Sequence, residues 1–505
     1  MALLSFLDRE HSVAAHGYSR WLIPPAALAI HLCIGQVYAT SVYKEALVEH
    51  FDSSLTAIGV IFSIAIVALG LSAAVFGTWV DRVGPRRTMF TSACCWSAGF
   101  FVAALGIATN QLWLVYVGYG VIGGIGLGLG YISPVSTLIK WFPDRPGLAT
   151  GMAIMGFGGG AMVAAPLSSW LLNRYDVANQ PGTAVWKLFV TLGAIYFVVM
   201  MFGVFTVRVA PPGYDPANKS ASTAQAQATP DVPKQSVTAG DAIKTPQFWL
   251  LWIVLLCNVT AGIGILEQAA EMIQDFFRNP DGISTVTAAV AAGFVGLLSV
   301  ANMAGRFAWS STSDYLGRKP TYMMYLGGGI VLYALLAGVG ATSTALFVLI
   351  CAVIISFYGG GFATAPAYLR DLFGTDQVGA IHGRLLTAWS TAGVLGPLIV
   401  NSVLDARGTP GELRAQDYRI AFYIMIGILA VGFLANLLIR PVSQRWFHPN
   451  AVVELPEPIE HPGDHGLRAV SHNYRVQVTI AWFIVGVPLV YGIVNAVRAA
   501  AKLFS

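Results

Sequence analysis

One arginine stands alone inside a long apolar stretch of this 505-residue chain. Between Asp281 and Asp314 the only charged residue is Arg306, in the run TVTAAVAAGFVGLLSVANMAGRFAW. A central intramembrane arginine costs roughly 2.5–3.5 kcal/mol on insertion scales, so it normally faces a cavity or a partner. No acidic residue lies near it in sequence, and no other apolar run carries a charge at comparable depth. We therefore expect Arg306 to bind an anionic ligand; the alternative is a structural arginine held by backbone carbonyls of a neighbouring helix.

Aromatic side chains fall at a similar depth in other apolar runs. Tyr131 and Tyr358 each lie about three helical turns before the basic residue that closes their run, which is mid-bilayer depth. A tyrosine can donate its hydroxyl to a carboxylate and pack its ring against the alkyl part of the same ligand. Phe157 and Trp389 share an offset of 232 (389 − 157) and would flank the pocket as a symmetric pair. The alternative for all four is ordinary helix packing.

Two further positions could carry protons. His31 lies in the middle of the first apolar run, seven residues before Tyr38 and on nearly the same helical face. It could titrate and couple a proton, or stay neutral and bond a neighbouring helix. Glu267 and Glu271 lie one turn apart, and Glu267 is about 30 Å along its helix from Pro246, at the outer mouth. We expect a solvated vestibule there, with a proton relay as the alternative.

The composition shows what kind of molecule positions these residues. The chain is 56% hydrophobic and 11% charged, with 54 glycines and a mean hydropathy of +0.65. A soluble protein would carry about a quarter charged residues, so the chain is a polytopic membrane protein. Its net charge of +4 needs no nucleic-acid partner, because the basic residues sort by membrane side. All five cysteines fall in apolar runs without metal-ligand spacing, and we expect no metal, cofactor or enzymatic activity.

Thirteen apolar runs are long enough to cross a bilayer, which takes about 20 residues. They are 21–44, 57–80, 88–108, 113–139, 147–172, 184–207, 247–270, 284–310, 321–340, 344–369, 379–404, 419–439 and 475–497. The glycine-rich stretch 120–130 lies inside one of them and therefore indicates close helix packing rather than nucleotide binding.

The first twelve apolar runs divide into two sets of six on either side of a polar segment. Residues 209–246 are rich in Pro, Ala, Ser and Gln and read as a disordered linker. The expected domains are 1–208, the linker, 247–440, and a polar connector with an added helix over 441–505. Loop Lys and Arg residues favour a cytoplasmic N-terminus by about two to one.

A short motif occurs in both halves. GTWVDRVGPRR at 77–87 and SSTSDYLGRK at 310–319 lie between the second and third runs of each half. Asp81 and Asp314, like Gly84 and Gly317, share an offset of 233 (314 − 81). Parallel six-helix repeats with a ligand site between them are typical of transporters. The expected fold is an all-α membrane protein with two pseudo-symmetric six-helix bundles and a thirteenth helix.

The first copy of this motif resembles the loop signature of the major facilitator superfamily. It is matched by Gly77, Asp81, Arg82, Gly84, Arg86 and Arg87, and the second copy keeps Asp314, Gly317 and Arg318. Pro85 departs from the first copy, and Ser310 and Tyr315 from the second. Physically, Asp81 at a helix end can bond basic residues and the N-terminus of a helix in the other half, which would hold one conformation closed. The alternative is a plain positively charged turn.

A narrower resemblance covers most of residues 19–440. SRWLIPPAALAIHLCIGQVYATSVYK, SPVSTLIKWFPDRPGLATGMAIMGFGGG, YGGGFATAPAYLRDLFG and GRLLTAWSTAGVLGP are similar to the oxalate/formate antiporter family, which is related to the monocarboxylate transporters. The resemblance implies that Arg306 binds substrate and that further pocket residues are Tyr38, Tyr131, Tyr358 and Gln36. It also implies a monomeric carrier in a bacterial cytoplasmic membrane, with lipid and a small organic anion as its partners.

Two departures from that family bear on the substrate. Its oxalate exchanger uses a second cation in the eleventh span, where this chain has Trp389. One buried positive charge suits a monoanion, because a dianion would leave one charge uncompensated in a low dielectric. The monocarboxylate transporters carry an acid one turn before the arginine, where this chain has Asn302. We therefore expect a carrier of small carboxylates by alternating access, favouring anion exchange; proton-coupled monocarboxylate symport and a non-transporting anion receptor remain alternatives.

The C-terminal segment adds one more feature. The run VQVTIAWFIVGVPLVYGIVNAV follows a proline-rich connector and resembles a single-helix subunit that accompanies some transporters of this group, here fused to the chain. An odd number of spans places the C-terminus opposite the N-terminus, although Arg498 and Lys502 run against the charge bias.

Overall fold

The computed structural model describes residues 2–15, 17–175, 181–211, 214, 235–279, 281–408, 413–448 and 474–501. Within these residues thirteen helical segments are long and apolar enough to cross a membrane, from Arg20–Ala39 to Tyr474–Arg498. This confirms the all-α membrane fold and the number of spans that the sequence predicts.

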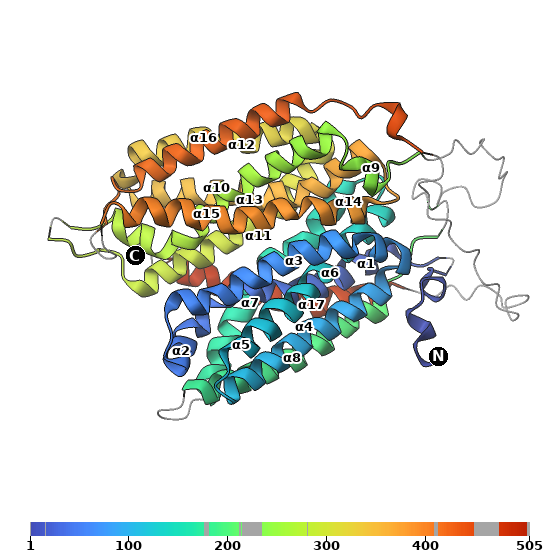
Figure 1. Ribbon diagram of the computed structural model, residues 1–505, viewed down its shortest axis with the longest axis horizontal. Coiled ribbons are helices and arrows are strands. Elements are labelled where there is room, and N and C mark those ends of the chain that lie inside the picture. The colour runs from blue at the N-terminus through green and yellow to red at the C-terminus, as the bar shows by residue number, and fades with distance from the viewer. Residues whose placement is uncertain are drawn as a thin grey trace, which may run out of the picture.

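The helices form two bundles, one from each half of the chain (Figure 1). The first half contains α1 Ile23–Ile34, α2 Ser41–Phe51, α3 Leu55–Val83, α4 Pro85–Ala108, α5 Leu112–Val115, α6 Gly124–Trp141, α7 Pro146–Tyr175 and α8 Pro181–Thr206. The second half contains α9 Ala239–Ala242, α10 Pro246–Phe276, α11 Ala288–Leu316, α12 Arg318–Val339, α13 Thr344–Phe373, α14 Val378–Leu385, α15 Thr387–Asp405 and α16 Arg419–Leu438. Short 3-10 segments are η1 Ala2–Leu7, η2 Glu10–Ser12, η3 Arg20–Leu22, η4 Gly35–Ala39, η7 Gly340–Thr342 and η8 Gln444–Trp446, and η5 Tyr116–Gly123 is a π-helix.

The internal repeat extends to the helix caps. The Ser54 side chain accepts a hydrogen bond from the Ala57 amide at the start of α3. Thr287 does the same for Val290 at the start of α11, again 233 positions later (287 − 54). Ser and Thr are favoured at this position because their oxygens satisfy an amide that has no partner within the helix. Corresponding helices of the two halves therefore begin in the same way.

Three spans that the sequence presents as continuous are interrupted. The first expected span, 21–44, ends as an α-helix at Ile34 and continues through η4 before α2 starts. At this break a Cβ on Gly35 would collide with the backbone of α7 at Phe157 and Gly160, so glycine permits the close crossing. The fourth span contains the π-helical η5, and the eleventh is divided between α14 and α15. Such local departures from regular helix are common at functional sites.

Both ends of the expected linker 209–246 make backbone contacts with the rest of the chain. Val209 pairs with Val13 beside the first bundle. On the other side, Val237 donates to the Phe373 carbonyl at 2.8 Å, and Thr238 caps α9. These backbone bonds and the cap fix both ends of a segment whose composition alone suggested disorder. The central part, 215–234, lies outside the described residues, as does most of the polar connector, 449–473.

The thirteenth span, α17 Tyr474–Ala501, packs against helices of both bundles. Leu489 contacts Met162 of α7 and Met303 of α11, and Val485 packs on Leu28 of α1. The opposite face of α17 is apolar and exposed, as expected of a surface in contact with lipid. In Figure 1 the C-terminus lies at the end of the molecule opposite the N-terminus.

Candidate anion-binding site

Arg306 lies on α11 where this helix packs against α7, and its side chain is fully buried. Its Nε donates to Asn302 Oδ1, one turn earlier on α11, at 2.9 Å. Its Nη1 reaches the Ile154 carbonyl of α7 at 3.4 Å, while Nη2 has no hydrogen-bond partner among the described residues. No ion pair formed by the described residues includes Arg306. One long bond to a carbonyl matches the structural alternative, but it leaves the charge uncompensated.

Aromatic rings enclose the guanidinium. Its carbon lies 5.8 Å from the ring centre of Phe157 on α7 and 5.2 Å from that of Phe362 on α13. A cation over an aromatic face gains roughly 0.5–2 kcal/mol, more when it is desolvated. Gly158 lies beside Arg306, and a Cβ there would come within 3.0 Å of Nε. Rings and a glycine therefore shape a slot for the planar group without supplying an anion.

Three tyrosine hydroxyls surround the same place. They belong to Tyr38 on η4, Tyr131 on α6 and Tyr358 on α13, and each lies within electrostatic reach of Arg306. Each hydroxyl oxygen is buried and makes no hydrogen bond of regular geometry to a described residue, although those of Tyr38 and Tyr131 approach Arg306 and that of Tyr358 approaches Tyr38. Buried polar groups in native proteins are almost always paired, so four such donor groups at one point need a common explanation. A carboxylate, which only accepts hydrogen bonds, would satisfy all of them.

Trp389 on α15 closes one side of this cluster. Its ring centre lies 5.5 Å from those of Tyr131 and Phe157 and 4.8 Å from that of Phe362. Tyr38 packs against Phe157 at 5.3 Å, and its ring is the one that is partly exposed. The cluster thus combines one permanent cation, three hydroxyls and apolar walls from both bundles.

Gln36, expected at this site, and Glu267, expected at the outer mouth, both have partners outside the cluster. The Gln36 amide donates to the Tyr43 hydroxyl and accepts from the Tyr119 hydroxyl, both at 3.0 Å and both within the first bundle. These bonds engage one amide hydrogen and the amide oxygen, and the role of Gln36 in binding substrate stays a prediction. Glu267 lies near Lys44 and Asn401, away from the cluster, which fits the expected vestibule.

Asn302, also expected among the substrate-binding residues, contacts Arg306 directly. Its Oδ1 holds Arg306 Nε, so it orients the guanidinium. His31, by contrast, does reach the edge of the cluster. Its Nε2 lies 3.3 Å from the Tyr131 carbonyl and its ring centre 5.4 Å from the Tyr131 ring.

The sequence did not single out two members of the cluster, Phe362 and His382. Phe362 follows Tyr358 by one helical turn, a spacing that could have indicated the same face of α13. His382 lies on α14 with its ring centre 5.8 Å from that of Tyr131. No local pattern marks His382, because only the packing of α14 against α6 brings it to the first bundle.

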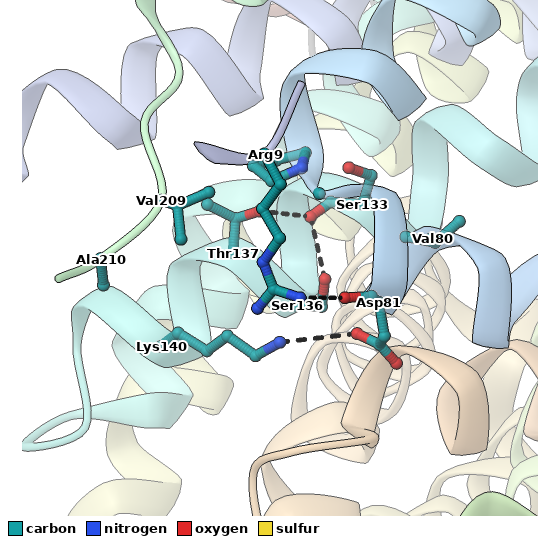
Figure 2. Close-up of a pocket in the computed structure, with 11 residues that line it drawn as sticks. Arg9, Val80, Asp81, Ser133, Ser136, Thr137, Lys140, Val209 and Ala210 are labelled. Atoms are coloured by element: carbon teal, nitrogen blue, oxygen red, sulfur yellow. Dashed lines mark hydrogen bonds and ion pairs between the residues drawn. The ribbon is translucent and has the colours of Figure 1, made fainter. Parts of the chain in front are cut away.

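The two motif aspartates lie between the bundles, at the end of the molecule that carries the N-terminus. We call the contacts of Asp81 and Asp314 the Asp81–Asp314 interface. Asp81 accepts a hydrogen bond from the Ala380 amide near the start of α14 at 2.9 Å and lies 3.5 Å from Lys140 Nζ. Beside it is a cavity of about 30 Å³, where Figure 2 shows Arg9 and Lys140 approaching Asp81 from two sides. The first motif aspartate therefore joins α3 of one bundle to α14 of the other.

Asp314 makes the equivalent contact from the second bundle. It accepts from the Gly147 and Leu148 amides at the start of α7, each at 2.8 Å. Arg318 donates to Asp314 at 2.6 Å and to Asp371 at 3.0 Å. Two helix N-termini, one in each bundle, are thus each held by an aspartate of the opposite bundle, a favourable arrangement for a carboxylate.

The structure explains why glycine stands at the glycine positions of the motif. A Cβ on Gly77 would come within 2.7 Å of Ala380 Cα, so glycine lets α3 and α14 touch. Gly84 and Gly317 have φ of +85° and +84°, in the region that favours glycine. In the second copy, Ser310 replaces the equivalent of Gly77, and there Gly147 of the partner helix is the small residue at the crossing.

The basic residues of the first motif copy hold the N-terminal segment. Arg86 donates to the Phe6 carbonyl at 2.8 Å, while Arg82 and Arg87 are exposed and Arg87 lies 3.5 Å from Asp8. Arg9 donates to the Asp81 carbonyl at 2.8 Å. Burial lowers the pKa of Arg9, and the nearby Asp81 opposes that shift.

Fold and site together define a membrane carrier with a central site between two related bundles. Residues 26–397 and 295–501 match the model of the Major Facilitator Superfamily, and the first match alone covers more than half of the chain. The chain belongs to this superfamily, whose members are transporters.

Individual relatives agree with this assignment. The chain is 25% identical over 365 residues to an uncharacterized MFS-type transporter, YhjX, of Escherichia coli K12, covering 72% of this chain and 83% of that protein. It is 26% identical over 380 residues to the oxalate:formate antiporter of Oxalobacter formigenes, covering 75% and 83%. Among solved structures it is similar to the transporter FucP in its outward conformation, with a TM-score of 0.61 and 14% identity over 84% of this chain and 100% of the other.

Proposed function

We propose that this transporter carries small organic anions with a single carboxylate, bound between Arg306 and the hydroxyls of Tyr38, Tyr131 and Tyr358. The observation that carries the proposal is the coincidence of four buried groups that lack hydrogen-bond partners of regular geometry among the described residues, one of them cationic. A carboxylate accepts two parallel bonds from a guanidinium and further bonds from hydroxyls. The similarity to the oxalate:formate antiporter supports the carboxylate class.

The count of permanent charges favours a monoanion. Arg306 is the single Lys or Arg that the contacts described above bring to the cluster, and Trp389 packs against Phe362 and adds a second apolar ring there. A dianion bound to one permanent cation would keep one uncompensated charge in a low dielectric. Formate, acetate, lactate and pyruvate are therefore the substrates to test first.

The transport mode that we propose is exchange. A buried, unpaired Arg306 is costly whenever the site closes on both sides, by several kcal/mol in comparison with other buried ions. A bound anion neutralises it, so the loaded carrier should cross between its two open states faster than the empty one. Asn302 orients Arg306 but cannot serve as its counterion.

Uptake into proteoliposomes tests this mode. Vesicles preloaded with unlabelled formate should take up labelled formate many-fold faster than empty vesicles, with little response to an imposed pH gradient. Equal uptake into empty and preloaded vesicles, driven by an inward proton gradient, would instead establish proton symport. Saturable binding without flux would identify a receptor.

We also propose that the N-terminus and the Asp81–Asp314 interface face the cytoplasm of a bacterial cell. The Lys and Arg bias of the loops supports this orientation. The N-terminal segment and the end of α8 pair at the same end of the molecule. In this orientation the Asp81–Asp314 interface is a cytoplasmic gate, and a monomer contains every element of the site.

A further inference from the structure

Two buried histidines, one from each bundle, lie beside the same tyrosine of the candidate site. His31 of α1 and His382 of α14 have their ring centres 5.4 Å and 5.8 Å from that of Tyr131. Both side chains are buried, with exposed fractions of 0% and 2%. In both rings Nδ1 has no hydrogen-bond partner among the described residues. The proposed monocarboxylate site makes no use of either ring.

The surroundings of His31 fix how its ring is used. Its Nε2 lies 3.3 Å from the Tyr131 carbonyl, and a carbonyl can only accept, so Nε2 carries a proton. The neutral ring then has its lone pair on Nδ1, the atom without a partner. The Ala153 carbonyl also acts on this ring, and the next carbonyl along α7, that of Ile154, accepts from Arg306. His31 and Arg306 are therefore linked through adjacent carbonyls of one helix.

His382 connects the candidate site with the Asp81–Asp314 interface. Its ring faces Tyr131, while Ala380, two residues earlier on α14, donates its amide to Asp81. A Cβ on Gly383, the next residue, would collide with the Ala73 carbonyl of α3. The backbone around His382 is thus held against the first bundle, which keeps this position of α14 beside the site.

The charged and titratable groups around the two rings come from several elements. Arg306 on α11 acts on His31, and Tyr131 on α6 contacts both rings. Tyr38 on η4 and Tyr358 on α13 lie near Tyr131, and Asp81 on α3 bonds Ala380, two residues before His382. Helix α7 presents backbone carbonyls. Arg306 opposes a second positive charge nearby, and a doubly charged anion bound to Arg306 would favour it.

We propose that His31 and His382 together form a titratable second-cation site, which takes up one proton when a dicarboxylate dianion binds to Arg306. The inference rests on the proposed function and extends it to a second substrate class. A monoanion neutralises Arg306 alone, whereas a dianion neutralises Arg306 and one imidazolium. The proton comes from the solution that supplies the dianion and leaves with it. The loaded site is neutral in both cases, so a dianion with its proton can exchange for a monoanion without net charge movement.

Linkage determines the sign of the pH dependence. Since the dianion favours the protonated pair, protonation must strengthen dianion binding by the same factor. Oxalate affinity should therefore rise as pH falls between about 8 and 5, the range in which histidines change charge, by roughly tenfold or more. Formate affinity should not follow this trend, because its charge is already matched by Arg306. Both probe anions keep their charges throughout this range.

Calorimetry on the purified full-length carrier tests the proposal directly. Oxalate binding is measured in two buffers with different heats of ionisation, so that the proton uptake is obtained from the difference, and formate is measured in parallel. We expect uptake of about one proton per oxalate and about none per formate. Binding of oxalate without proton uptake would overturn the proposal, and this result needs no variant.

The double variant His31→Gln, His382→Gln supplies the second test. Glutamine retains an amide donor in place of Nε2–H but does not titrate. The ratio of oxalate to formate affinity should become independent of pH in this variant, and measurable formate binding shows that it folds. A ratio that still rises in acid would overturn the proposal. The proposed function fails separately, if the wild type binds neither anion or if Arg306→Ala leaves formate binding intact.

Discussion

Arg306 in α11 and Arg318 just after its C-terminal end are both buried, but their positive charges are compensated differently. Arg318, just after the end of α11, is paired with Asp314 and Asp371 at 2.6 and 3.0 Å, and it also donates to Ser313. Arg306, inside the same helix, is more deeply buried and has one amide oxygen, one distant carbonyl and no acid. Arg318 therefore has its counterions in the protein, whereas Arg306 lacks one among the described residues, as we expect of an arginine that binds an anionic ligand.

The polar groups around the two arginines differ in the same way, because those around Arg318 are paired and those around Arg306 are not. Around Arg318, Asp314 also accepts two backbone amides, so Arg318 and Asp314 both have their charges paired within the protein. Around Arg306, three hydroxyls make no hydrogen bond of regular geometry to a described residue. A hydrogen-bond network in which all groups are paired stabilises one arrangement of the bundles. A network with unpaired donors can be completed by a ligand.

The largest expected difference is in stability. Arg318→Met should lower the free energy of unfolding by about 3 kcal/mol, since breaking a buried ion pair leaves Asp314 and Asp371 without their partner. Arg306→Met should change it little or raise it, because it removes a buried charge that has no counterion. Thermal unfolding of both variants in the same detergent measures this. Equal destabilisation by the two substitutions would show that Arg306 is also structural.

Substitutions of the two motif aspartates, Asp314 and Asp81, should differ less in their effects on stability than substitutions of the two arginines. Asp314→Asn weakens two backbone bonds and one ion pair, and we expect a loss of about 2 kcal/mol in stability. Asp81→Asn weakens one backbone bond and a 3.5 Å pair with Lys140, for about 1 kcal/mol. Melting temperatures of both variants, with Asp405→Asn at the exposed end of α15 as the control, give the order. A larger effect at Asp81 would contradict the ranking of the two halves.

A smaller effect should follow when a second permanent charge is placed beside Arg306. Trp389→Lys should shift the preference from formate towards oxalate at neutral pH by about tenfold, which is about 1.4 kcal/mol. The reason is that a permanent cation would compensate the second charge of the dianion. Competition binding measures the shift, with Trp389→Phe as the control for the lost ring. Tight oxalate binding by the wild type at neutral pH, without proton uptake, would contradict the charge count.

The sequence predicted the features that appear as a charged residue within or beside an apolar run, and the apolar runs themselves. Arg306 and the repeated Asp81 and Asp314 stand out because charges are costly within or next to a membrane span. The thirteen spans follow from apolar length alone, and the description of the chain as an all-α carrier was correct.

What the sequence could not predict depends on the packing of one helix against another. The sequence gives no sign that the Gln36 amide forms hydrogen bonds with two tyrosines of its own bundle. His382 and Phe362 reach the site only through the crossing of α13 and α14 with the first bundle. At the break after Ile34, Gly35 of η4 contacts α7 closely, which no local pattern in the sequence reveals.

The most direct test of the central claim is the affinity of the purified protein for formate, measured by calorimetry on the wild type, Arg306→Lys and Arg306→Ala. The exposed Arg419→Ala serves as the control. We expect Arg306→Ala to weaken binding by at least about 100-fold, because charge-assisted hydrogen bonds contribute about 1.5–3 kcal/mol each. Arg306→Lys should also weaken it strongly, because an ammonium group cannot reproduce the planar pair of bonds. Formate binding by Arg306→Ala with the affinity of the wild type would contradict the account.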